Sequence, residues 1–523
     1  MISLFSHLTR LGRTGFVFAR EGVFGMIDPA PLPLPVRAAL RVARLIERPQ
    51  GEAGSVRLSA ALTRLGPTYV KLGQFMATRP DVVGVAVARE LESLQDRMPP
   101  FPQGEAEATI ARAFDKPLRE VFVSFGPSVA AASIAQVHRA EVMTPDGPKA
   151  VAVKVLRPGI ERRFKVDQDA FAFAARKAEA FSAEARRLRM IETAATLRRS
   201  VALEMDLRLE AAALSEMAEN IKDDPDFRVP SVDWERTAKE VLTLEWIDGT
   251  PLSDHAALRA KGFDLPKLGQ AVIQSFLRHA LRDGFFHADM HPGNLFVDAD
   301  GRIVAVDFGI MGRLGPKERR FLAEILYGFI TRNYLRTAEV HFEAGYVPSH
   351  HSVESFAQAI RAIGEPIHNR TAEEISMAKL LMLLFEVTGL FDMRTRPELL
   401  LLQKTMVVVE GVARTLDPRL DMWRTAEPVV REWMERHLGP VGRIEDAAGG
   451  AAELGRFLGG VPQLLSRGAA VLEQLDAATR NGLVLAPETV ADIGRAEARR
   501  NRWTAVALWV IAALLAYLVF ALL

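Results

Sequence analysis

The spacing of apolar and polar residues predicts a mostly helical chain that contains a few short strands. Two runs with strand-like alternation, residues 136–142 and 149–155, flank the turn sequence Thr-Pro-Asp-Gly at 144–147, which predicts a β-hairpin. A further strand is predicted over 240–247, and a second hairpin is predicted within 285–309. The other regular patterns along the chain have the period of a helix.

The order of these elements indicates the fold class. The Ala/Ser-rich stretch before the first hairpin is predicted to be a loop. A small β-containing segment with one long helix inserted precedes a mostly helical segment, and a strand and short turn join them at about 247–250. This is the order of an α+β, two-lobed, protein-kinase-like fold. Helical periodicity covers residues 36 to about 120, about 167 to 220, 265–283, and the region after 309 to about 436.

The same patterns divide the chain into six parts. They are a basic amphipathic N-terminal segment (1–35), a helical extension (36–123), a kinase-like N-lobe (124–250), a kinase-like C-lobe (251–437), a Gly/Ala-rich linker (438–502) and a transmembrane helix (503–523).

The last of these parts carries no charged residue. At about 1.5 Å per residue, residues 503–523 reach about 30 Å, the thickness of a bilayer core. Arg499, Arg500 and Arg502 stand directly before the segment, and the positive-inside rule then predicts a single-pass protein whose preceding residues face the cytoplasm. The alternative is a buried core helix.

The N-terminal segment is not a secretory signal, because Arg10, Arg13 and Arg20 interrupt any apolar run. Its mild amphipathicity fits either a helix that lies on a membrane surface or a packed N-terminal helix, and the packed helix is favoured.

Composition excludes several kinds of chemistry. The 523 residues include no cysteine, which rules out disulfides, thiolate metal sites and cysteine nucleophiles. Lys and Arg number 66 against 65 Asp and Glu, and this net charge of +1 argues against nonspecific nucleic-acid binding.

The second predicted hairpin carries the densest chemistry. If Asp300-Gly301 forms a two-residue turn, counting outward places Asn294 opposite Asp307. Cross-strand partners have Cβ atoms about 4.5–5.5 Å apart, so the amide oxygen and the carboxylate can share one Mg²⁺. The sequence therefore predicts Asn294 and Asp307 as metal ligands.

Two further features support phosphate chemistry there. Asp289 precedes Asn294 by five residues, the D-x-x-x-x-N spacing of phosphotransfer enzymes, in which the Asp orients or deprotonates the acceptor hydroxyl. Asp307-Phe-Gly309 is a D-F-G sequence, which supplies a metal carboxylate in those enzymes. The alternative is a solvated hairpin whose Asp and Asn residues cap turns.

A lysine on the first hairpin is the candidate phosphate ligand. Val151-Ala-Val-Lys154 resembles the strand motif V-A-I-K, and period-two alternation puts Lys154 on the face opposite the valines. The alternative is a solvent-exposed edge-strand lysine. Such a lysine is usually tethered by a helix glutamate. The residues alone leave three candidates for that partner, Glu204, Asp206 and Glu210.

No G-x-G-x-x-G sequence precedes the lysine strand. An alanine-rich stretch stands in its place, and because alanine adopts positive φ poorly, its backbone is expected to approach phosphate differently from a glycine loop. This should alter nucleotide preference or slow phosphoryl transfer. The stretch contains Ala130, Ala131, Ala132 and Ser133.

Taken together, these motifs resemble the UbiB family of atypical kinase-like proteins, which support ubiquinone biosynthesis. The resemblance covers about residues 40 to 435. The matching motifs are Lys71-Leu-Gly-Gln74 (K-x-G-Q), Ala130-Ala-Ala-Ser133, Val-Ala-Val-Lys154, Glu204-Met-Asp206 (E-x-D), Glu210, His287-Ala-Asp289-Met-His-Pro-Gly-Asn294 and Asp307-Phe-Gly309.

The resemblance implies roles for specific residues. It pairs Lys154 with Glu210 and directs Lys71 over the active site toward Glu204 and Asp206. The extension that carries Lys71 and Gln74 would cover the groove in which a protein kinase binds its peptide. Catalytic roles are therefore expected for Asp289, Lys71, Gln74, Glu204 and Asp206. Glu245 and Ile247 are expected to offer backbone groups to adenine.

The implied function is an ATPase, dependent on ATP and Mg²⁺, that supports ubiquinone biosynthesis at the bacterial inner membrane. Polyprenylphenol or quinone precursor lipids, the membrane and other ubiquinone-biosynthesis enzymes are the expected partners, and protein kinase activity is not expected. One alternative is a small-molecule or lipid kinase that phosphorylates a prenylphenol-like acceptor. Another is a nucleotide-binding scaffold of a biosynthetic complex.

Overall fold

The computed structural model separates the chain into one unit, Met1–Glu435, and a second, Arg436–Leu523. The predicted linker and transmembrane span lie outside the described residues, and no helix within the described part of the chain is long and apolar enough to cross a membrane. The structure describes residues 2–26, 34–48, 57–77, 98–367, 389–393 and 397–439, with the single residues 83, 87, 90, 91, 94 and 387.

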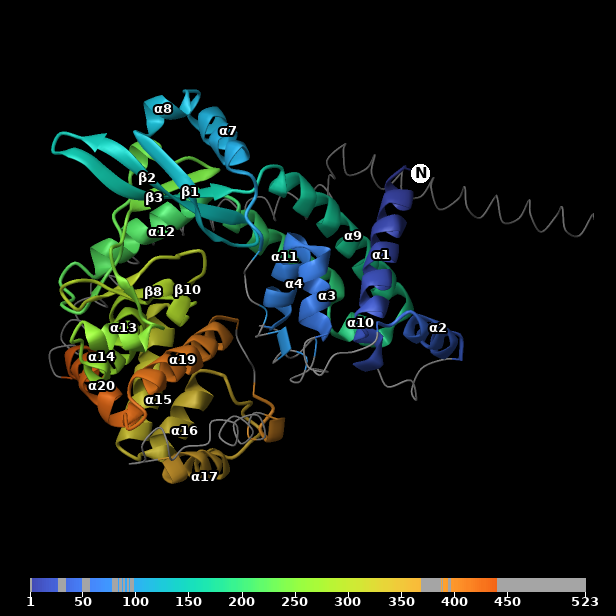
Figure 1. Cartoon of the computed structure of the whole chain (residues 1–523). Coiled ribbons are helices and arrows are strands. Elements are labelled where there is room, and N and C mark those ends of the chain that lie inside the picture. Colours follow the sequence, from blue (N-terminus) through green and yellow to red (C-terminus); the bar gives the residue numbers. More distant parts are fainter. Residues whose placement is uncertain are drawn as a thin grey trace, which may run out of the picture. The chain divides into compact units, whose positions relative to one another are not determined.

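An antiparallel sheet of four strands in the order β1-β2-β3-β5 forms the N-lobe. Its core strands are the predicted hairpin, closed at Thr144 and Gly147. Figure 1 shows α7 and α8 above the sheet and α12 below it. The bounds are β1 (Ser124–Ala131), β2 (Ala135–Thr144), β3 (Gly147–Leu156), β5 (Val241–Glu245), α7 (Gln103–Phe114), α8 (Leu118–Val121) and α12 (Leu207–Asn220).

The prediction of a loop before the first hairpin is wrong, because residues 124–131 form the strand β1. Its Gly, Pro, Ser and Ala residues have weak strand propensity, and two irregularities interrupt its register between Phe125 and Ala130. Pairing along the edge of β2 therefore decides its conformation, and local propensity does not.

The two faces of β3 differ as the alternation predicts. Val151, Val153 and Val155 are buried in a cluster that includes Ile110 of α7. Lys154 lies on the other face, toward α12, and its side chain is only 16% exposed. The strand therefore holds a lysine over a helix, as part of a charged site.

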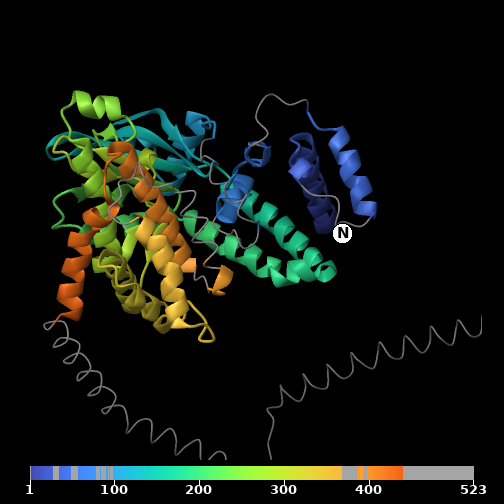
Figure 2. The same ribbon diagram turned by 90° about the horizontal axis from the view of Figure 1, so that it is seen from below.

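A group of helices lies beside the N-lobe (Figures 1 and 2). Arg10 of the N-terminal helix ion-pairs with Asp167, and Thr14 hydrogen-bonds Tyr69 at 2.6 Å. The packed-helix interpretation of the N-terminus is therefore confirmed. The group comprises α1 (Ile2–Arg20), α2 (Leu34–Leu45), α3 (Arg57–Leu65), α4 (Pro67–Ala77), α9 (Ile160–Phe181), α10 (Ala183–Arg187) and α11 (Met190–Glu204).

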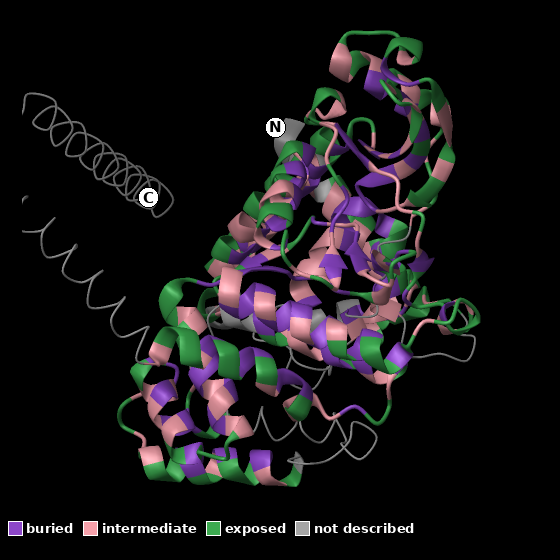
Figure 3. Cartoon of the chain, turned by 90° about the vertical axis from the view of Figure 1, so that its left-hand side faces the viewer, coloured by how far each residue is buried: buried purple, intermediate pink, exposed green. Residues whose placement is uncertain are grey.

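Helices and two small sheets form the C-lobe, in the strand orders β4-β9-β8-β6 and β10-β7. Its helices bury one face and expose the other (Figure 3). The strands are β4 (Phe227–Arg228), β6 (Thr250–Pro251), β7 (Phe285–His287), β8 (Leu295–Val297), β9 (Ile303–Ala305) and β10 (Met311–Arg313). The helices are α13 (His255–Ala260), α14 (Leu265–Arg278), α15 (Pro316–Ile330), α16 (Tyr334–Glu343), α17 (Val353–Gly364), α19 (Pro397–Leu416) and α20 (Met422–Leu438).

The second hairpin is present, but its predicted register is wrong by one residue. Val297 pairs with Ile303 and Leu295 with Ala305, which places Asn294 opposite Val306. The turn is longer than two residues because the Asp298 carboxylate accepts the backbone N–H groups of Asp300 and Arg302. Gly301 then adopts a φ of 80°, as the last residue of a three-residue turn does.

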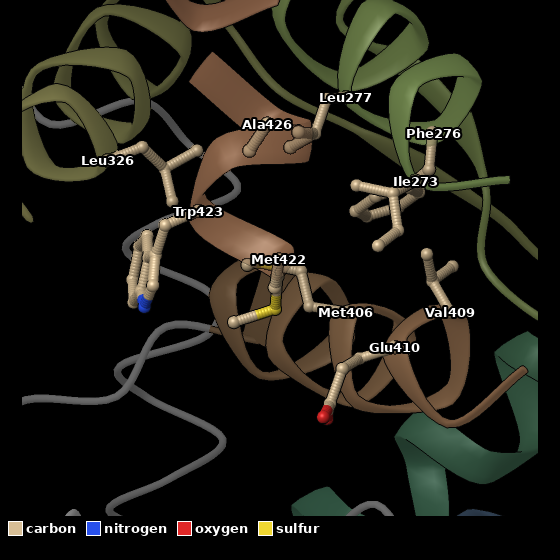
Figure 4. Close-up of a pocket in the computed structure, with 10 residues that line it drawn as sticks. All are labelled: Ile273, Phe276, Leu277, Leu326, Met406, Val409, Glu410, Met422, Trp423 and Ala426. Carbon is tan, nitrogen blue, oxygen red and sulfur yellow. The ribbon is translucent and has the colours of Figure 1, made fainter. Parts of the chain in front are cut away.

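A hollow with about 370 Å³ of space between atoms, part of it open to solvent, lies among α14, α15, α19 and α20. Figure 4 shows the apolar side chains of Ile273, Phe276 and Val409 on one side of it and the ring of Trp423 on the other. Glu410 is the single ionisable residue in its lining. The hollow lies among different elements from those that carry the charged motifs.

A buried carboxylate ties β4 and the end of α14 together. Asp224 accepts hydrogen bonds from His279 and Arg282, and its side chain is 3% exposed. Burial alone would raise the pKa of Asp224, but hydrogen bonds and charge from His279 and Arg282 outweigh it and lower the pKa to about 2.

We expect this group to make stability depend on acid. A depressed pKa contributes stability that is present above pH 4 and lost as the pH falls toward 2, by about 2 kcal/mol in full. The difference in unfolding free energy between the wild type and Asp224→Asn, from urea titrations at pH 7, 5, 4 and 3, should narrow below pH 4. A difference that stays constant across this series would contradict the expectation.

Candidate active site

The predicted Lys154–Glu210 pair is present. The Nζ atom of Lys154 lies 2.8 Å and 3.0 Å from the two carboxylate oxygens of Glu210. Helix α12 begins at Leu207 with Asp206 as its N-cap, and this places Glu210 under β3 with its side chain 7% exposed. Three acidic residues were candidate partners for Lys154, and the structure shows that Glu210 is the one that pairs with it.

Asp307 reaches the same lysine from the C-lobe. Its Oδ1 atom lies 3.3 Å from Lys154 Nζ and accepts the backbone N–H of Gly309 at 3.1 Å. The backbone N–H of Phe308 points to Glu210 at 3.4 Å. The Asp-Phe-Gly segment is therefore joined to both members of the N-lobe pair, while 45% of the Asp307 side chain stays exposed.

The charges of this cluster shift one another's ionisation. Burial alone would lower the pKa of Lys154, but Asp307 and Glu210 outweigh it and raise that pKa. Burial would raise the pKa of Asp307, and Lys154 with the Gly309 N–H holds it well below its ordinary value. Burial raises the pKa of Glu210, against the opposing effect of Lys154. Lys154 therefore stays protonated and Asp307 stays ionised beside it.

The D-x-x-x-x-N segment folds back on itself. The Asn294 side-chain amide donates to the backbone carbonyl of Asp289 at 3.1 Å and to its Oδ2 atom at 3.2 Å. Both side chains are partly exposed. These contacts hold Asp289 and Asn294 next to each other, whereas the predicted cross-strand pairing of Asn294 with Asp307 is replaced by that of Asn294 with Val306.

His287 is a functional candidate for which the sequence predicts no role of its own. Its Nδ1 atom accepts the backbone N–H of Asp289 at 3.0 Å, and its ring lies 4.9 Å from that of Phe308. Burial lowers the pKa of His287, which favours the neutral ring that this accepted hydrogen bond requires. His287 therefore contacts both the Asp289 segment and the Asp-Phe-Gly segment. Its position two residues before Asp289 was the sequence feature that could have pointed to such a role.

Thr405 is a second residue that the sequence did not single out. Its hydroxyl, on the buried face of α19, lies 2.8 Å from the Leu401 carbonyl of its own helix and 3.2 Å from the Ala288 carbonyl, so its single proton is shared between these two acceptors. Ala288 lies between His287 and Asp289. Thr405 is thus a positioning residue for the segment that carries Asp289, since it touches that segment's backbone.

We expect Thr405→Val to cost about 1 kcal/mol of stability, because the hydroxyl shared between the Ala288 and Leu401 carbonyls is lost, and to lower kcat more than it changes KM for the activity proposed below. Thr415→Val is the matched control, since the Thr415 hydroxyl bonds only its own helix, to Val412 at 2.7 Å, in the described contacts. Equal kinetic effects of the two substitutions would contradict a positioning role.

The K-x-G-Q lysine also finds a predicted partner. Lys71 of α4 lies 2.6 Å from the Glu204 carboxylate, and the two side chains are 11% and 15% exposed. Gln74 follows one turn later on the same helix and is partly exposed. Asp206 caps α12 and pairs with the Arg208 guanidinium at 2.7 Å. Glu204 is thus the acid of the E-x-D motif that the structure joins to Lys71.

The alanine-rich stretch closes the end of β1. Ala130 and Ala131 belong to the strand, and the N–H of Ala132 donates to the Ala135 carbonyl at 2.8 Å. The Arg157 guanidinium donates to the Ala132 carbonyl at 2.9 Å, and Ser133 is fully buried. The Ala132 amide is therefore engaged within the turn, unlike the free amides of a glycine-rich phosphate loop.

The expected adenine contacts lie at the end of β5. The N–H of Glu245 donates to the Ser231 carbonyl at 2.9 Å, and its carboxylate pairs with Arg228 at 3.1 Å. Ile247 is partly exposed in the segment between β5 and β6. The Glu245 N–H is thus already used within the protein, which leaves Ile247 with its backbone groups as the freer of the two predicted contacts.

The oxygen donors of Asp307 and of the Asp289–Asn294 turn suit a hard divalent cation. Asp307 presents an ionised, half-exposed carboxylate, and Asn294 and Asp289 add an amide and a carboxylate from one turn. Mg²⁺ takes such oxygen ligands and fills its remaining positions with phosphate and water. The donor set therefore fits Mg²⁺ bound together with a nucleotide, beside a lysine that can contact phosphate.

Comparison with known proteins agrees with this arrangement. Residues 93–341 match the ABC1 atypical kinase-like domain, and residues 360–421 match the UbiB helical domain. A protein of Marinobacter nauticus named "Probable protein kinase UbiB" is 40% identical over 447 residues, which cover 84% of this chain and 81% of that protein. The chain belongs to the UbiB family.

Other relatives are similar. A protein of Azotobacter vinelandii with the same name is 38% identical over 76% of this UbiB-family chain and 75% of its own length. Among solved structures, the Rv3197–erythromycin complex from Mycobacterium tuberculosis has 24% identity and a TM-score of 0.47, and the match covers 76% of this chain and 97% of that one. The matches to the ABC1 atypical kinase-like domain, to the UbiB helical domain and to the two named relatives confirm the predicted family and its kinase-like fold.

Proposed function

We propose that this UbiB-family protein binds Mg-ATP in the N-lobe and C-lobe motifs and hydrolyses it in support of ubiquinone biosynthesis at the bacterial inner membrane. The observation that carries the proposal is the position of Lys154, which contacts Glu210 of the N-lobe and Asp307 of the Asp-Phe-Gly segment at once. In kinase-like phosphotransferases this lysine–glutamate pair and the metal carboxylate must both be in place.

Each residue has a separate task in this proposal. Lys154 contacts the α- and β-phosphates, and Glu210 holds the Lys154 ammonium at the face of β3. Asp307 and Asn294 would hold Mg²⁺, which would neutralise charge on the phosphates. The Asp289 carboxylate orients the attacking water by accepting a hydrogen bond from it. Asn294 and His287 fix the position of Asp289.

The helical extension favours hydrolysis over protein phosphorylation. Lys71 of α4 is joined to Glu204 at the end of α11, next to the N-cap of α12, the helix that carries Glu210. In this proposal, the segment that carries Lys71 would occupy space that a protein substrate needs. Water is small enough to reach Asp289 in its presence.

The membrane part of the proposal rests on sequence and on one surface. Residues 503–523 provide the single span. Val42, Leu45 and Ile46 at the end of α2 are exposed by 64%, 82% and 46%, beside the exposed Arg41. A basic helix with apolar side chains in solvent suits contact with a lipid surface. Removal of residues 503–523 should release the protein from sedimenting membranes, and continued sedimentation would count against the anchor.

The test of function is ATP turnover by the purified full chain in lipid vesicles, with and without a prenylphenol. Release of inorganic phosphate that depends on Mg²⁺, with no phosphorylated lipid, is the expected result. Transfer of ³²P to the prenylphenol would instead establish a lipid kinase. Absence of both activities, together with full support of quinone synthesis in cells by Asp307→Asn, would establish a nucleotide-binding scaffold and overturn the proposal.

A further inference from the structure

We propose that His350, His351 and Asp392 form a zinc-type divalent-cation site in the C-lobe, separate from the residues that handle nucleotide. The two histidines follow α16 and precede α17, and the aspartate follows Phe391 in a later segment. Within the described part of the chain, these residues are the one group whose His and carboxylate donor atoms all lie within 4.8 Å of one another.

The donor geometry fits a tetrahedral ion. The Nε2 atoms of His350 and His351 lie 3.6 Å and 3.2 Å from the same oxygen, Oδ2 of Asp392. Ligands at about 2.1 Å from a tetrahedral Zn²⁺ are separated from each other by about 3.4 Å. The two separations stand on either side of that value, and the donor nitrogens of His350 and His351 lie within 4.8 Å of each other, so side-chain rotation can bring all three donors around an ion.

The chemical types of the three ligands also indicate which metals the site would bind. Two imidazoles and one carboxylate leave a fourth position for water, the composition of open zinc sites. Mg²⁺ prefers oxygen donors alone, so this cluster differs chemically from the set around Asp307. The ring centroids of His350 and His351 lie 4.1 Å apart, which keeps both rings over the same carboxylate.

The backbone that carries the donors is fixed by the core. Phe391 is 6% exposed and packs with Phe356 of α17 at 5.0 Å, and His351 lies 5.3 Å from its ring. Ser352 caps α17 directly after the histidines. Asp392 has a φ of 47°, a conformation that Asp tolerates better than most residues. The donors are thus placed by packed elements on both sides.

A bound ion would join two segments that are 41 residues apart in sequence. The chain between them includes α17, and α19 follows the aspartate with Thr405 on its buried face. A metal clip that closes a long loop stabilises the folded state. We therefore expect the ion to stabilise this part of the C-lobe, with no direct role in phosphate chemistry.

The experiment measures Zn²⁺ and Co²⁺ binding by the full chain without a histidine tag, in detergent. We expect saturable binding of Zn²⁺, visible absorption typical of tetrahedral Co²⁺, and a higher Tm in Zn²⁺ than in a chelator. His351→Ala and Asp392→Asn should each weaken Zn²⁺ affinity at least about tenfold and remove the Tm shift. His255→Ala, a histidine on α13 outside the cluster, should leave both unchanged.

Two outcomes would overturn the inference. One is wild-type protein that binds no Zn²⁺ saturably in dialysis at micromolar metal. The other is binding that survives in His350→Ala, His351→Ala and Asp392→Asn alike, which would place the ion elsewhere. Circular dichroism and Tm of each variant in the chelator separate loss of the site from loss of the fold. Neither outcome bears on ATP turnover, which is scored separately.

Discussion

Asp307→Asn is expected to lower Mg²⁺-dependent ATP hydrolysis at least about a hundredfold. The substitution removes one negative charge from the position where the carboxylate faces both Lys154 and solvent, and an amide is a weaker ligand for Mg²⁺. Shape and size are nearly unchanged, so the fold should persist. Phosphate release by purified protein in vesicles, over a range of Mg²⁺ concentrations, measures the effect.

The matched control is Asp300→Asn in the turn of the second hairpin. Asp300 is 73% exposed and pairs with Arg302 at 2.8 Å, so its charge is also near a cation but faces solvent away from Lys154. We expect its rate to stay within about twofold of the wild type. If Asp307→Asn retains the rate of the control at saturating Mg²⁺, Asp307 is not the metal carboxylate and the proposed mechanism fails.

The second large effect is expected on stability. Lys154→Met leaves the Glu210 carboxylate 7% exposed and without its ammonium partner. Breaking a buried pair in this way costs about 3 kcal/mol, because one charge remains in a poorly solvated position. The unfolding free energy from urea titration at pH 7 should fall by that amount, and nucleotide binding should be lost in the same protein.

The pH dependence of that deficit follows from Glu210. Burial raises its pKa, and without Lys154 the opposing attraction is gone. A group with a raised folded-state pKa contributes stability at low pH that is lost as the pH rises, so the deficit of Lys154→Met should be largest at neutral pH and shrink as the pH falls toward 5. A deficit that grows on acidification would contradict this explanation.

Two further variants distinguish the effect of the buried charge on stability from the effect of lost packing. Lys154→Met/Glu210→Gln has no buried charge at this position and should recover more than half of the lost stability, without recovering nucleotide binding. Lys239→Met is the control for loss of an exposed pair, since Lys239 and Glu161 are 45% and 70% exposed, and it should change stability by less than about 0.5 kcal/mol. Equal losses in Lys154→Met and Lys239→Met would show that the Lys154 pair is not buried in solution.

Local patterns were sufficient for much of the fold. The alternation of valines around Lys154 placed the lysine on the correct face of β3, and the turn sequence at 144–147 placed the turn of the first hairpin correctly. These succeed because strand alternation and tight turns depend on residues that are close in sequence. Asp289 and Asn294 are in contact for a similar reason, since they are only five residues apart in sequence.

Other predictions failed where a contact from outside the segment decided the result. The stretch that became β1 has weak strand propensity and pairs because the edge of β2 offers partners. The second hairpin shifted by one residue because the Asp298 side chain binds the turn backbone, which residue counting does not include. That shift separates Asn294 from the position opposite Asp307 and joins it to Asp289.

The sequence by itself identified the candidate site residues: the strand lysine, the Asp-Phe-Gly carboxylate and the Asp289–Asn294 pair. The partners of Lys154 depend on the tertiary structure, because it meets Glu210 across 56 residues and Asp307 across 153. The family resemblance implied the first of these pairs, and local patterns implied neither. The tertiary structure likewise brought Thr405 to Ala288 and Asp392 to His351, and no local period or propensity encodes such pairs. The physical reason is that each distant pair depends on the packing of whole helices and strands.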